Sequence, residues 1–278
     1  MSRDQEKTNK LLFKLCMKGK WEEVVEMYRN DKKVWKARIT RLGDTALHVA
    51  VADGKDDVVQ QLVKLICWEE DEEGKEALRI ENERGNTVLH FAASMGSVQT
   101  CEYIASAEVS LLNIRNVDGE TPLFLAAMHG RKDAFLSLHY YYYYNICTQA
   151  HPNHPNYYSN CTRNDGDTVL HSAIAGDYFD LAFQIIHLFK DFANRKNQRG
   201  FSPLHLLASK PSAFRSGSHF GLFQTIVYHG IFVKPLEVAS YCQQLHPTVG
   251  KEKNGYPENY KTCINLLRVI KNAASVGR

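Results

Sequence analysis

GDTALHVAVADG (residues 43–54) is the stretch that decides the fold, because similar versions of it recur four times along the chain. The later copies are GNTVLHFAASMG (85–96), GETPLFLAAMHG (119–130), GDTVLHSAIAGD (166–177) and GFSPLHLLASKP (200–211). Their opening glycines are separated by 42, 34, 47 and 34 residues. Such recurrence is typical of a repeat protein, in which each unit packs against its neighbours.

Each position in the repeated stretch has a role that its chemistry explains. The opening glycine permits a positive φ in a tight turn, and the Thr or Ser two residues later is a good N-cap for a helix. Pro122 and Pro203 suit the first helical position, where no amide donor is needed. The copies therefore predict a turn and then a short helix whose leucine faces the core, at Leu47, Leu89, Leu123, Leu170 and Leu204.

A second helix is predicted at a fixed offset from each of the first four Thr residues. Apolar or small residues recur there four positions apart, which describes the buried face of a helix. Upstream, residues 11–28 have the same helix–glycine–helix pattern with polar substitutions, as expected for a terminal repeat. The offset positions are Val58, Thr100, Ala134 and Leu181, and then Leu62, Ile104, Leu138 and Ile185.

The repeated stretch resembles the ankyrin signature T-P-L-H-x-A, whose period is about 33 residues. The resemblance implies an all-α ankyrin-repeat solenoid of about six helix-turn-helix repeats with β-turn fingers, irregular insertions and a C-terminal capping helix. We expect an N-terminal capping repeat at 1–36 and a repeat array at 37–230, with insertions near 68–78 and 140–162. An irregular segment and an amphipathic helix are expected at 231–278.

The sequences of four segments resemble those of a narrower group of ankyrin proteins: residues 85–104, 119–139, 166–189 and 200–230. This group is the plant ankyrin–transmembrane family of the accelerated-cell-death type, whose members usually end in a PGG domain with membrane helices. The resemblance covers about residues 11–270 and implies membrane-associated signalling in plant defence, stress response or cell death. No PGG motif and no run of ~18 apolar residues is present, so no direct membrane span is expected in this chain. We expect a cytoplasmic protein, or one on the cytosolic face of a membrane if the natural protein continues into a PGG domain.

Composition limits the classes of partner. The net charge is +3 with both signs mixed along the chain, whereas a nucleic-acid binder usually carries a concentrated basic stripe. Seven cysteines without framework spacing suit a reducing compartment. The clearest charge run, Glu69–Glu73 with Glu76, is expected to be a solvated loop, with a docking patch for a basic partner as the alternative.

Candidate chemistry is sparse. His48, His90, His171 and His205 share one repeat position, which Phe124 fills in the third full copy. Because they are spaced along the solenoid, we expect each to hydrogen-bond a finger turn to its helix instead of joining a catalytic or metal site. The sequence has no phosphate-binding glycine loop, catalytic triad or paired carboxylates, so it predicts neither an enzyme nor a cofactor.

Two irregular features lie in the second insertion. Cys147, His151, His154 and Cys161 are ligand types that zinc uses, but their spacing matches no common zinc site, so metal binding is the weaker alternative. Tyr140–Tyr144 are expected to prolong the preceding helix. Five successive residues cannot share one buried face, so these tyrosines either cover the insertion or contact a partner.

Ankyrin arrays usually bind partners through finger tips and the exposed side of the first helices, and alignment of the repeats assigns those positions here. Apolar residues among them favour a partner surface, and acidic residues at the centre predict a basic or mixed partner. The leading hypothesis is a scaffold that binds a protein or peptide, and the alternative is a self-assembly module that oligomerises an ankyrin–transmembrane protein or channel. The predicted partner-binding residues are Arg41, Leu42, Asp44, Glu83, Arg84, Met95, Asp118, Glu120, Met128, His129, Asp165, Asp167, Arg199 and Phe201.

Overall fold

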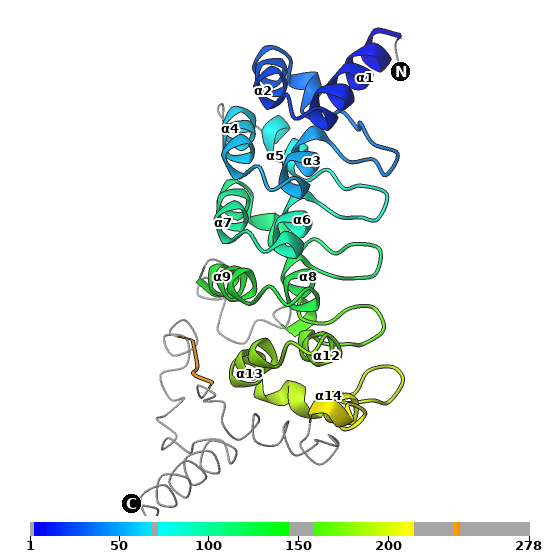
Figure 1. The fold of residues 1–278 in the computed structure, drawn as a ribbon, viewed down its shortest axis with the longest axis vertical. Coiled ribbons are helices and arrows are strands. Elements are labelled where there is room, and N and C mark those ends of the chain that lie inside the picture. Colours follow the sequence, from blue (N-terminus) through cyan, green and yellow to red (C-terminus); the bar gives the residue numbers. More distant parts are fainter. Residues whose placement is uncertain (1–2, 68–71, 145–157, 214–235, 240–278) are drawn as a thin grey trace, which may run out of the picture.

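A computed structural model describes residues 3–67, 72–144, 158–213 and 236–239. The first three of these ranges form an elongated stack of helix pairs (Figure 1). The first helices of the pairs form one column: α1 (Arg3–Met17), α3 (Ala46–Ala52), α6 (Val88–Met95), α8 (Pro122–Met128), α12 (Val169–Ala175) and α14 (Pro203–Ala208). The second helices form the neighbouring column: α2 (Trp21–Asn30), α4 (Asp56–Ile66), α7 (Val98–Ala107), α9 (Lys132–Tyr142) and α13 (Phe179–Leu188). The predicted solenoid of about six helix-turn-helix units is confirmed, with α14 beginning the sixth unit.

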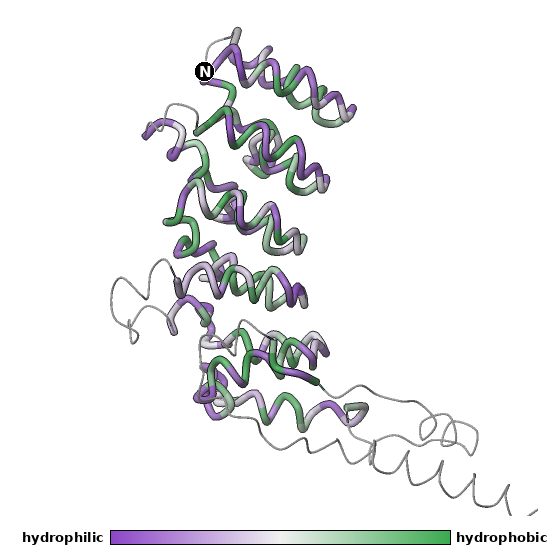
Figure 2. The backbone as a smooth tube through the Cα atoms, turned by 90° about the vertical axis from the view of Figure 1, so that its left-hand side faces the viewer, coloured by the Kyte–Doolittle hydropathy of each residue, from purple (hydrophilic) through white to green (hydrophobic). Residues whose placement is uncertain are grey.

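Small residues allow the first helices to approach closely. Helix α6 packs against α3 and α8, and α12 packs against α8 and α14. The alanines between these helices are fully buried, so backbone meets backbone without a large side chain between them: Ala50, Ala92, Ala93, Ala126, Ala127 and Ala173. Hydrophobic and hydrophilic residues alternate along the helices, as expected when one side of each is buried (Figure 2).

The core is continuous along the stack and follows the predicted positions with one clear exception. Leu47, Leu89, Leu123 and Leu170 are buried, whereas Leu204 is 66% exposed. The prediction for Leu204 was wrong because α14 is the last helix of the described array, and α12 and the short helix before its finger are its described neighbours. In the second column the predicted positions are buried except Val58, which is half-buried: Thr100, Ala134, Leu181, Leu62, Ile104, Leu138 and Ile185.

The turns and caps form as the repeated stretch predicts. Thr45, Thr87, Thr121, Thr168 and Ser202 are the N-cap residues of the first helices that follow them, and the two prolines occupy the start of α8 and α14. The opening glycines all have positive φ. At Gly119, φ is +77° and an added Cβ would lie 2.0 Å from Oδ1 of Asn164 in the next repeat. Glycine there serves both the turn and the close approach of two repeats.

A short helical segment follows most of the second helices and carries large apolar residues into the core. These segments are the 3-10 helices η1 (Lys32–Val34), η2 (Val109–Asn113) and η4 (Lys190–Asn194). In the second unit the α-helix α5 (Glu72–Leu78) takes this place, with Ala77 and Leu78 buried. The described end of the acidic run is therefore helical and not a loop, because the apolar residues of α5 pack on the stack. Residues 68–71 lie outside the described residues.

The remaining irregular regions are described only in part. Helix α9 continues into the tyrosine run as predicted, burying Tyr142 to 4% exposure and leaving Tyr144 63% exposed. Cys161 is buried, and the other three members of the candidate zinc set lie outside the described residues. The expected capping helix also lies outside them. Within the described ranges, no helix is long and apolar enough to cross a membrane.

Candidate functional site

Five fingers project from one side of the stack, beyond the column of first helices (Figure 1). We define a finger as the five residues from three before the opening glycine to one after it: 40–44, 82–86, 116–120, 163–167 and 197–201. In each later finger the first residue donates its N–H to the carbonyl of the fifth, as Asn116 does to Glu120 at 2.9 Å. The glycine N–H returns to the carbonyl of the first residue, which closes the turn.

Main-chain hydrogen bonds join successive fingers into a ladder. The second residue of each finger donates its N–H to the carbonyl oxygen of the third residue in the finger before it. The distances are 2.7 Å from Glu83 to Leu42, and 3.0 Å for each of the other three pairs: Val117 to Arg84, Asn164 to Asp118, and Gln198 to Asp165. Because the tip residues supply this ladder, their side chains are held at fixed spacing before any partner arrives.

Side chains form a second ladder beside the first. The first residue of a finger donates to the side chain of the fifth residue in the preceding finger. Asn82 bonds Asp44 at 2.8 Å, and Asn197 bonds Asp167 at 2.7 Å. The same asparagines accept two N–H groups of their own finger, which fixes the turn. These asparagines were not among the predicted residues, although Asn recurs three positions before the glycine in three of the copies.

Three of the four repeated histidines bond the N-cap of their own helix and also the next repeat. In His48, Nδ1 accepts the Thr45 N–H at 3.2 Å, and Nε2 lies 3.2 Å from the carbonyl oxygen of Asn86. Because a carbonyl oxygen only accepts, Nε2 carries the proton and the ring is neutral. His90 and His171 repeat this arrangement with Glu120 and Phe201. The predicted hydrogen-bonding role is confirmed, and the contact across repeats adds to it.

Burial has an electrostatic consequence for these rings. It lowers the pKa of His48 and of His90 from 6.5 to about 4, because a buried imidazolium loses its hydration. In α8, where Phe124 replaces the histidine, the Thr121 hydroxyl instead donates to the carbonyl of Asn160 at 2.7 Å. A different pair of atoms therefore joins the third and fourth full repeats at that position.

The predicted tip residues fall into three groups, of which the half-buried one consists of Asp165 and Asp167. Arg41, Leu42, Glu83, Arg84, Asp118, Arg199 and Phe201 are exposed. Asp44 and Glu120, the fifth residues of their fingers, are only 9% and 5% exposed. The Asp44 carboxylate bonds Thr40 and Asn82, and that of Glu120 bonds Asn116 at 3.0 Å. These two carboxylates are thus engaged inside the stack.

One cation changes the electrostatics at the centre of the surface. Arg163 forms ion pairs with Asp165 at 2.6 Å, Asp167 at 3.2 Å and Glu120 at 3.5 Å. Its hydrogen bond holds the pKa of Asp165 below its ordinary value. The predicted acidic centre therefore consists of three carboxylates whose charge is partly neutralised by Arg163. Arg163 was not among the predicted residues; it occupies the position where three other fingers have asparagine, and this difference is the sequence signal that could have identified it.

The exposed side of the first helices adds a mixed surface beside the fingers. Met95 at the end of α6 is 45% exposed, Met128 at the end of α8 is half-buried, and His129 is exposed. The Arg131 side chain donates to the carbonyl of Ser94 at 2.9 Å, which links the ends of these two helices. Exposed or half-buried residues, both apolar and polar, thus lie at the C-terminal ends of α6 and α8, whose N-terminal ends follow the fingers.

Comparison with known proteins identifies the repeats. A family profile described as ankyrin repeats in three copies matches residues 65–150, and the single ankyrin-repeat profile matches residues 42–66. The chain contains ankyrin repeats. It is 32% identical over 123 residues to a Saccharomyces cerevisiae protein named "Probable 26S proteasome regulatory subunit p28". The match covers 44% of this chain, and the chain spans only about half the length of that relative, 50%.

These findings support the coarse part of the predicted function. Ankyrin repeats suggest a scaffold that binds proteins, and the name of the relative, a regulatory subunit, fits protein interaction. Among the described residues, no three His, Cys, Asp or Glu side chains gather as metal ligands would. The ankyrin surface is instead built from exposed residues on a rigid ladder.

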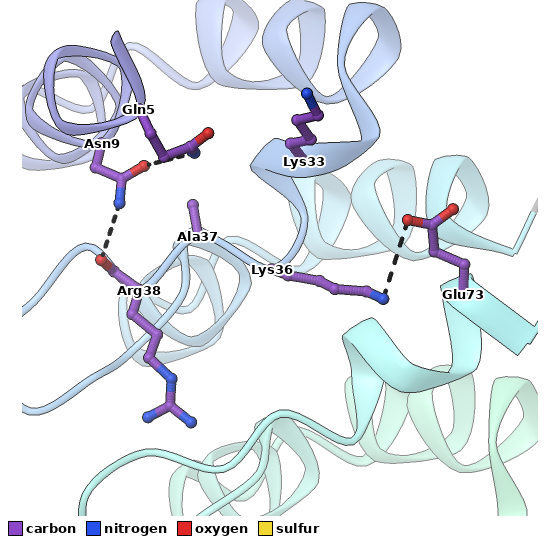
Figure 3. A pocket seen from close by; sticks show the side chains of 7 residues that line it. All are labelled: Gln5, Asn9, Lys33, Lys36, Ala37, Arg38 and Glu73. Atoms are coloured by element: carbon purple, nitrogen blue, oxygen red, sulfur yellow. Dashed lines mark hydrogen bonds and ion pairs between the residues drawn. The ribbon is translucent and has the colours of Figure 1, made fainter. Parts of the chain in front are cut away.

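A shallow hollow also lies at the N-terminal end of the ankyrin stack, between α1, η1 and α5 (Figure 3). Lys36 reaches across it to Glu73 at 3.9 Å and pairs more closely with Glu76 at 2.7 Å. On the α1 side, Gln5 bonds Asn9, whose amide donates to the Arg38 carbonyl at 3.5 Å. These polar groups satisfy one another, so the hollow is a packing junction between the first two repeats.

Proposed function

We propose that this protein binds another protein or a peptide through the tips of its fingers and the adjoining ends of the first helices. The main-chain ladder carries the proposal, because it presents exposed side chains from all five fingers at fixed positions. A rigid surface loses little conformational entropy when a partner binds. Exposed Leu42 and Met95 supply apolar contacts, and Arg41, Glu83, Arg84, Asp118 and Arg199 supply charged ones.

The partner that suits the centre of this surface is basic or of mixed charge. Arg163 neutralises part of the charge of Glu120, Asp165 and Asp167, while exposed Asp118 lies in the finger before it. Helix α8 begins two residues after the third finger, and Met128, its last residue, and His129, its C-cap, are also proposed to contact the partner. Asp44 and Glu120 are left out of the proposed contact surface, because their carboxylates already bond within the stack.

Affinity capture tests the proposal by comparing the wild-type chain with variants that alter exposed residues of the finger surface. The baits are the wild-type chain, Asp118→Lys, and the double variant Leu42→Ser with Met95→Ser. The captured proteins are identified and quantified by mass spectrometry. Ile186→Ser is the control, because Ile186 is 40% exposed on α13 in the other column of helices. We expect one set of proteins to be lost with both finger-surface variants and kept with the control. Equal capture by all four baits overturns the proposed site.

Charge reversal of Glu120 with Asp167 is a poor test of binding. Both carboxylates hold Arg163, and Asp167 also accepts from Asn197, so the reversal would disturb the ladder itself. Asp118 is the better position because its side chain is exposed.

Self-assembly is the second candidate for the same surface. A solenoid that oligomerises would serve to organise an ankyrin–transmembrane protein or channel, as the family resemblance of the repeats implies. Light scattering coupled to size-exclusion chromatography separates the two candidates. A mass of one chain at every concentration supports partner binding, and a stable oligomer that Asp118→Lys dissociates supports self-assembly.

The physiological setting that we propose is the cytosolic side of plant defence, stress or cell-death signalling. The support for it is the similarity of residues 85–104, 119–139, 166–189 and 200–230 to plant ankyrin–transmembrane proteins. Disruption of the gene in its plant, followed by measurement of pathogen growth and lesion formation, tests this setting. Unchanged growth and lesions in the disrupted line would remove it and would leave the binding surface unaffected.

A further inference from the structure

The fifth finger ends the main-chain ladder of the described residues. In the first four fingers the carbonyl of the third residue accepts an N–H from the finger that follows. The corresponding carbonyl in the fifth finger belongs to Arg199, and no described residue donates to it. His205 shows the same difference. Its Nδ1 bonds Ser202, but its Nε2 meets no carbonyl among the described residues, unlike Nε2 of His48, His90 and His171.

The side chain on this open edge also differs from those of the other fingers. The fifth residue of a finger is Asp44, Asn86, Glu120 or Asp167 in the first four, and each bonds the finger that follows. In the fifth finger it is Phe201, which cannot accept such a bond and is 47% exposed. Its ring meets the His205 ring edge-on, with centroids 6.1 Å apart. Leu204, 66% exposed, lies beside His205 in α14.

The charge of the fifth finger and of the residues just before it is different as well. Arg195, Lys196 and Arg199 are all exposed, and residues 192–201 contain no Asp or Glu. In the fourth finger, by contrast, Arg163 is surrounded by carboxylates. The open edge therefore carries the apolar Phe201 and Leu204 together with Arg199, and two further exposed cations precede it in the sequence.

We propose that this end face, defined as Arg199, Phe201, Leu204 and His205, binds an extended acidic segment of a partner protein that adds to the finger ladder. The segment supplies a main-chain N–H to the Arg199 carbonyl and a main-chain carbonyl to Nε2 of His205. One apolar side chain packs against Phe201 and Leu204, and flanking carboxylates face Arg195, Lys196 and Arg199. Addition of an extended peptide to an open main-chain edge is a general mode of recognition.

Two observations select this occupant. The end face continues an interface that the chain repeats four times, so the atoms it offers are those that a further extended segment satisfies. Its basic side disfavours a second copy of the chain, because two such faces would bring Arg195, Lys196 and Arg199 against the same cations. The inference adds a second binding surface and does not depend on contacts at the first four finger tips.

A labelled peptide tests the inference on the full-length protein. Fluorescence anisotropy is measured with fluorescein-labelled Glu-Val-Asp-Leu-Glu-Val-Asp, and with a second peptide in which lysine replaces each acidic residue. We expect the acidic peptide to bind, the lysine peptide not to bind, and the acidic peptide to weaken as salt increases. Phe201→Ser and Leu204→Ser should each weaken binding by about tenfold, the size typical of a central interface residue.

Controls keep each outcome decisive. Ile186→Ser removes a similarly exposed apolar residue from α13 and should leave peptide affinity unchanged. Arg199→Glu tests the same face without removing an apolar group, in case a serine variant unfolds. Asp118→Lys should also leave affinity unchanged, so failure of this inference is distinguishable from failure of the finger-tip site.

Three results would overturn the inference. The first is no binding of the acidic peptide by the wild-type protein, and the second is equal binding of both peptides. The third is protection of Phe201 and Leu204 from hydroxyl radicals in the free full-length chain, which would show that the chain's own residues cover the end face.

Discussion

Nε2 of His90 lies 3.1 Å from the carbonyl oxygen of Glu120, 30 residues further along the chain and in the next ankyrin repeat. The same ring accepts the Thr87 N–H through Nδ1 at 3.1 Å. One neutral imidazole thus caps the helix that contains it and joins two repeats. Both bonds need a ring with one donor and one acceptor, so protonation of the ring must break one of them.

The stability of the protein should fall as the pH drops from about 6.5 to about 4. Burial lowers the pKa of His48 and His90 to about 4, below the 6.5 of the unfolded chain, so the unfolded chain takes up protons first. The free energy of unfolding is therefore undiminished by these histidines above pH 6.5, and it decreases as the pH falls from 6.5 towards 4. Each histidine contributes roughly 3 kcal/mol at most. Urea unfolding followed by circular dichroism at several pH values measures the slope.

A variant with fewer buried histidines separates this effect from the titration of carboxylates. His90→Gln should show a shallower loss of unfolding free energy across this pH range than the wild type, after correction for its lower stability at neutral pH. His129→Gln, at an exposed position, should keep the wild-type slope. Identical slopes in all three proteins would contradict the assignment to the buried rings.

His90→Ala should lower the free energy of unfolding by about 2–4 kcal/mol at neutral pH. The substitution leaves a cavity at a fully buried position, removes the acceptor of the Thr87 N–H and takes away one of the two donors to the Glu120 carbonyl. Chemical denaturation measures the change. Met95→Ala on the same helix α6, where the side chain is 45% exposed, should change the value by less than about 0.5 kcal/mol.

Much of the fold could be predicted from sequence because the repeat constrains it five times over. Glycine, Thr or Ser, and leucine recur at fixed offsets, and each has one local explanation. Leu204 failed because the offset predicts which face of a helix points inward, but not whether a neighbour is present there. The repeat offset depends only on local sequence, whereas burial at the end of a stack depends on whether another element packs there.

The candidate surface was harder to predict because exposure depends on contacts between repeats. Asp44 and Glu120 occupy finger positions by alignment, yet side chains from the next finger bury them. Arg163 was missed for the same reason, since its three carboxylate partners lie in two different fingers. Alignment of the copies identifies equivalent positions, whereas the contacts across a repeat boundary require the three-dimensional stack.

Asn82→Ala should destabilise the protein by about 2–3 kcal/mol, because it removes several bonds at one buried point. The amide donates to Asp44 at 2.8 Å and accepts the N–H groups of Arg84 and Asn86. Loss of the amide leaves a carboxylate that is 9% exposed without one of its donors. Asn30→Ala is the matched control, since Asn30 makes one exposed bond to Glu26. A change at Asn82 no larger than that at Asn30 would show that the side-chain ladder adds nothing to stability.

Gly119→Ala should destabilise the protein more than Gly54→Ala, although both glycines have positive φ. At Gly54, φ is +64° and an added Cβ meets nothing within 4 Å, so only the backbone preference is lost, about 1–2 kcal/mol. At Gly119 the added Cβ would lie 2.0 Å from Oδ1 and 3.0 Å from the backbone N of Asn164. The Asn164 side chain can turn away, but its N–H belongs to the ladder through a bond to the Asp118 carbonyl.

The difference between the two alanine variants therefore measures the contact between the third and fourth fingers. We expect Gly119→Ala to lose at least about 1 kcal/mol more than Gly54→Ala in urea unfolding. Hydrogen exchange of the Asn164 amide should increase in the first variant and stay unchanged in the second, because only the first variant moves the two fingers apart. Equal destabilisation with unchanged exchange would mean that the fingers separate at no cost, and the ladder would then not hold the binding surface rigid.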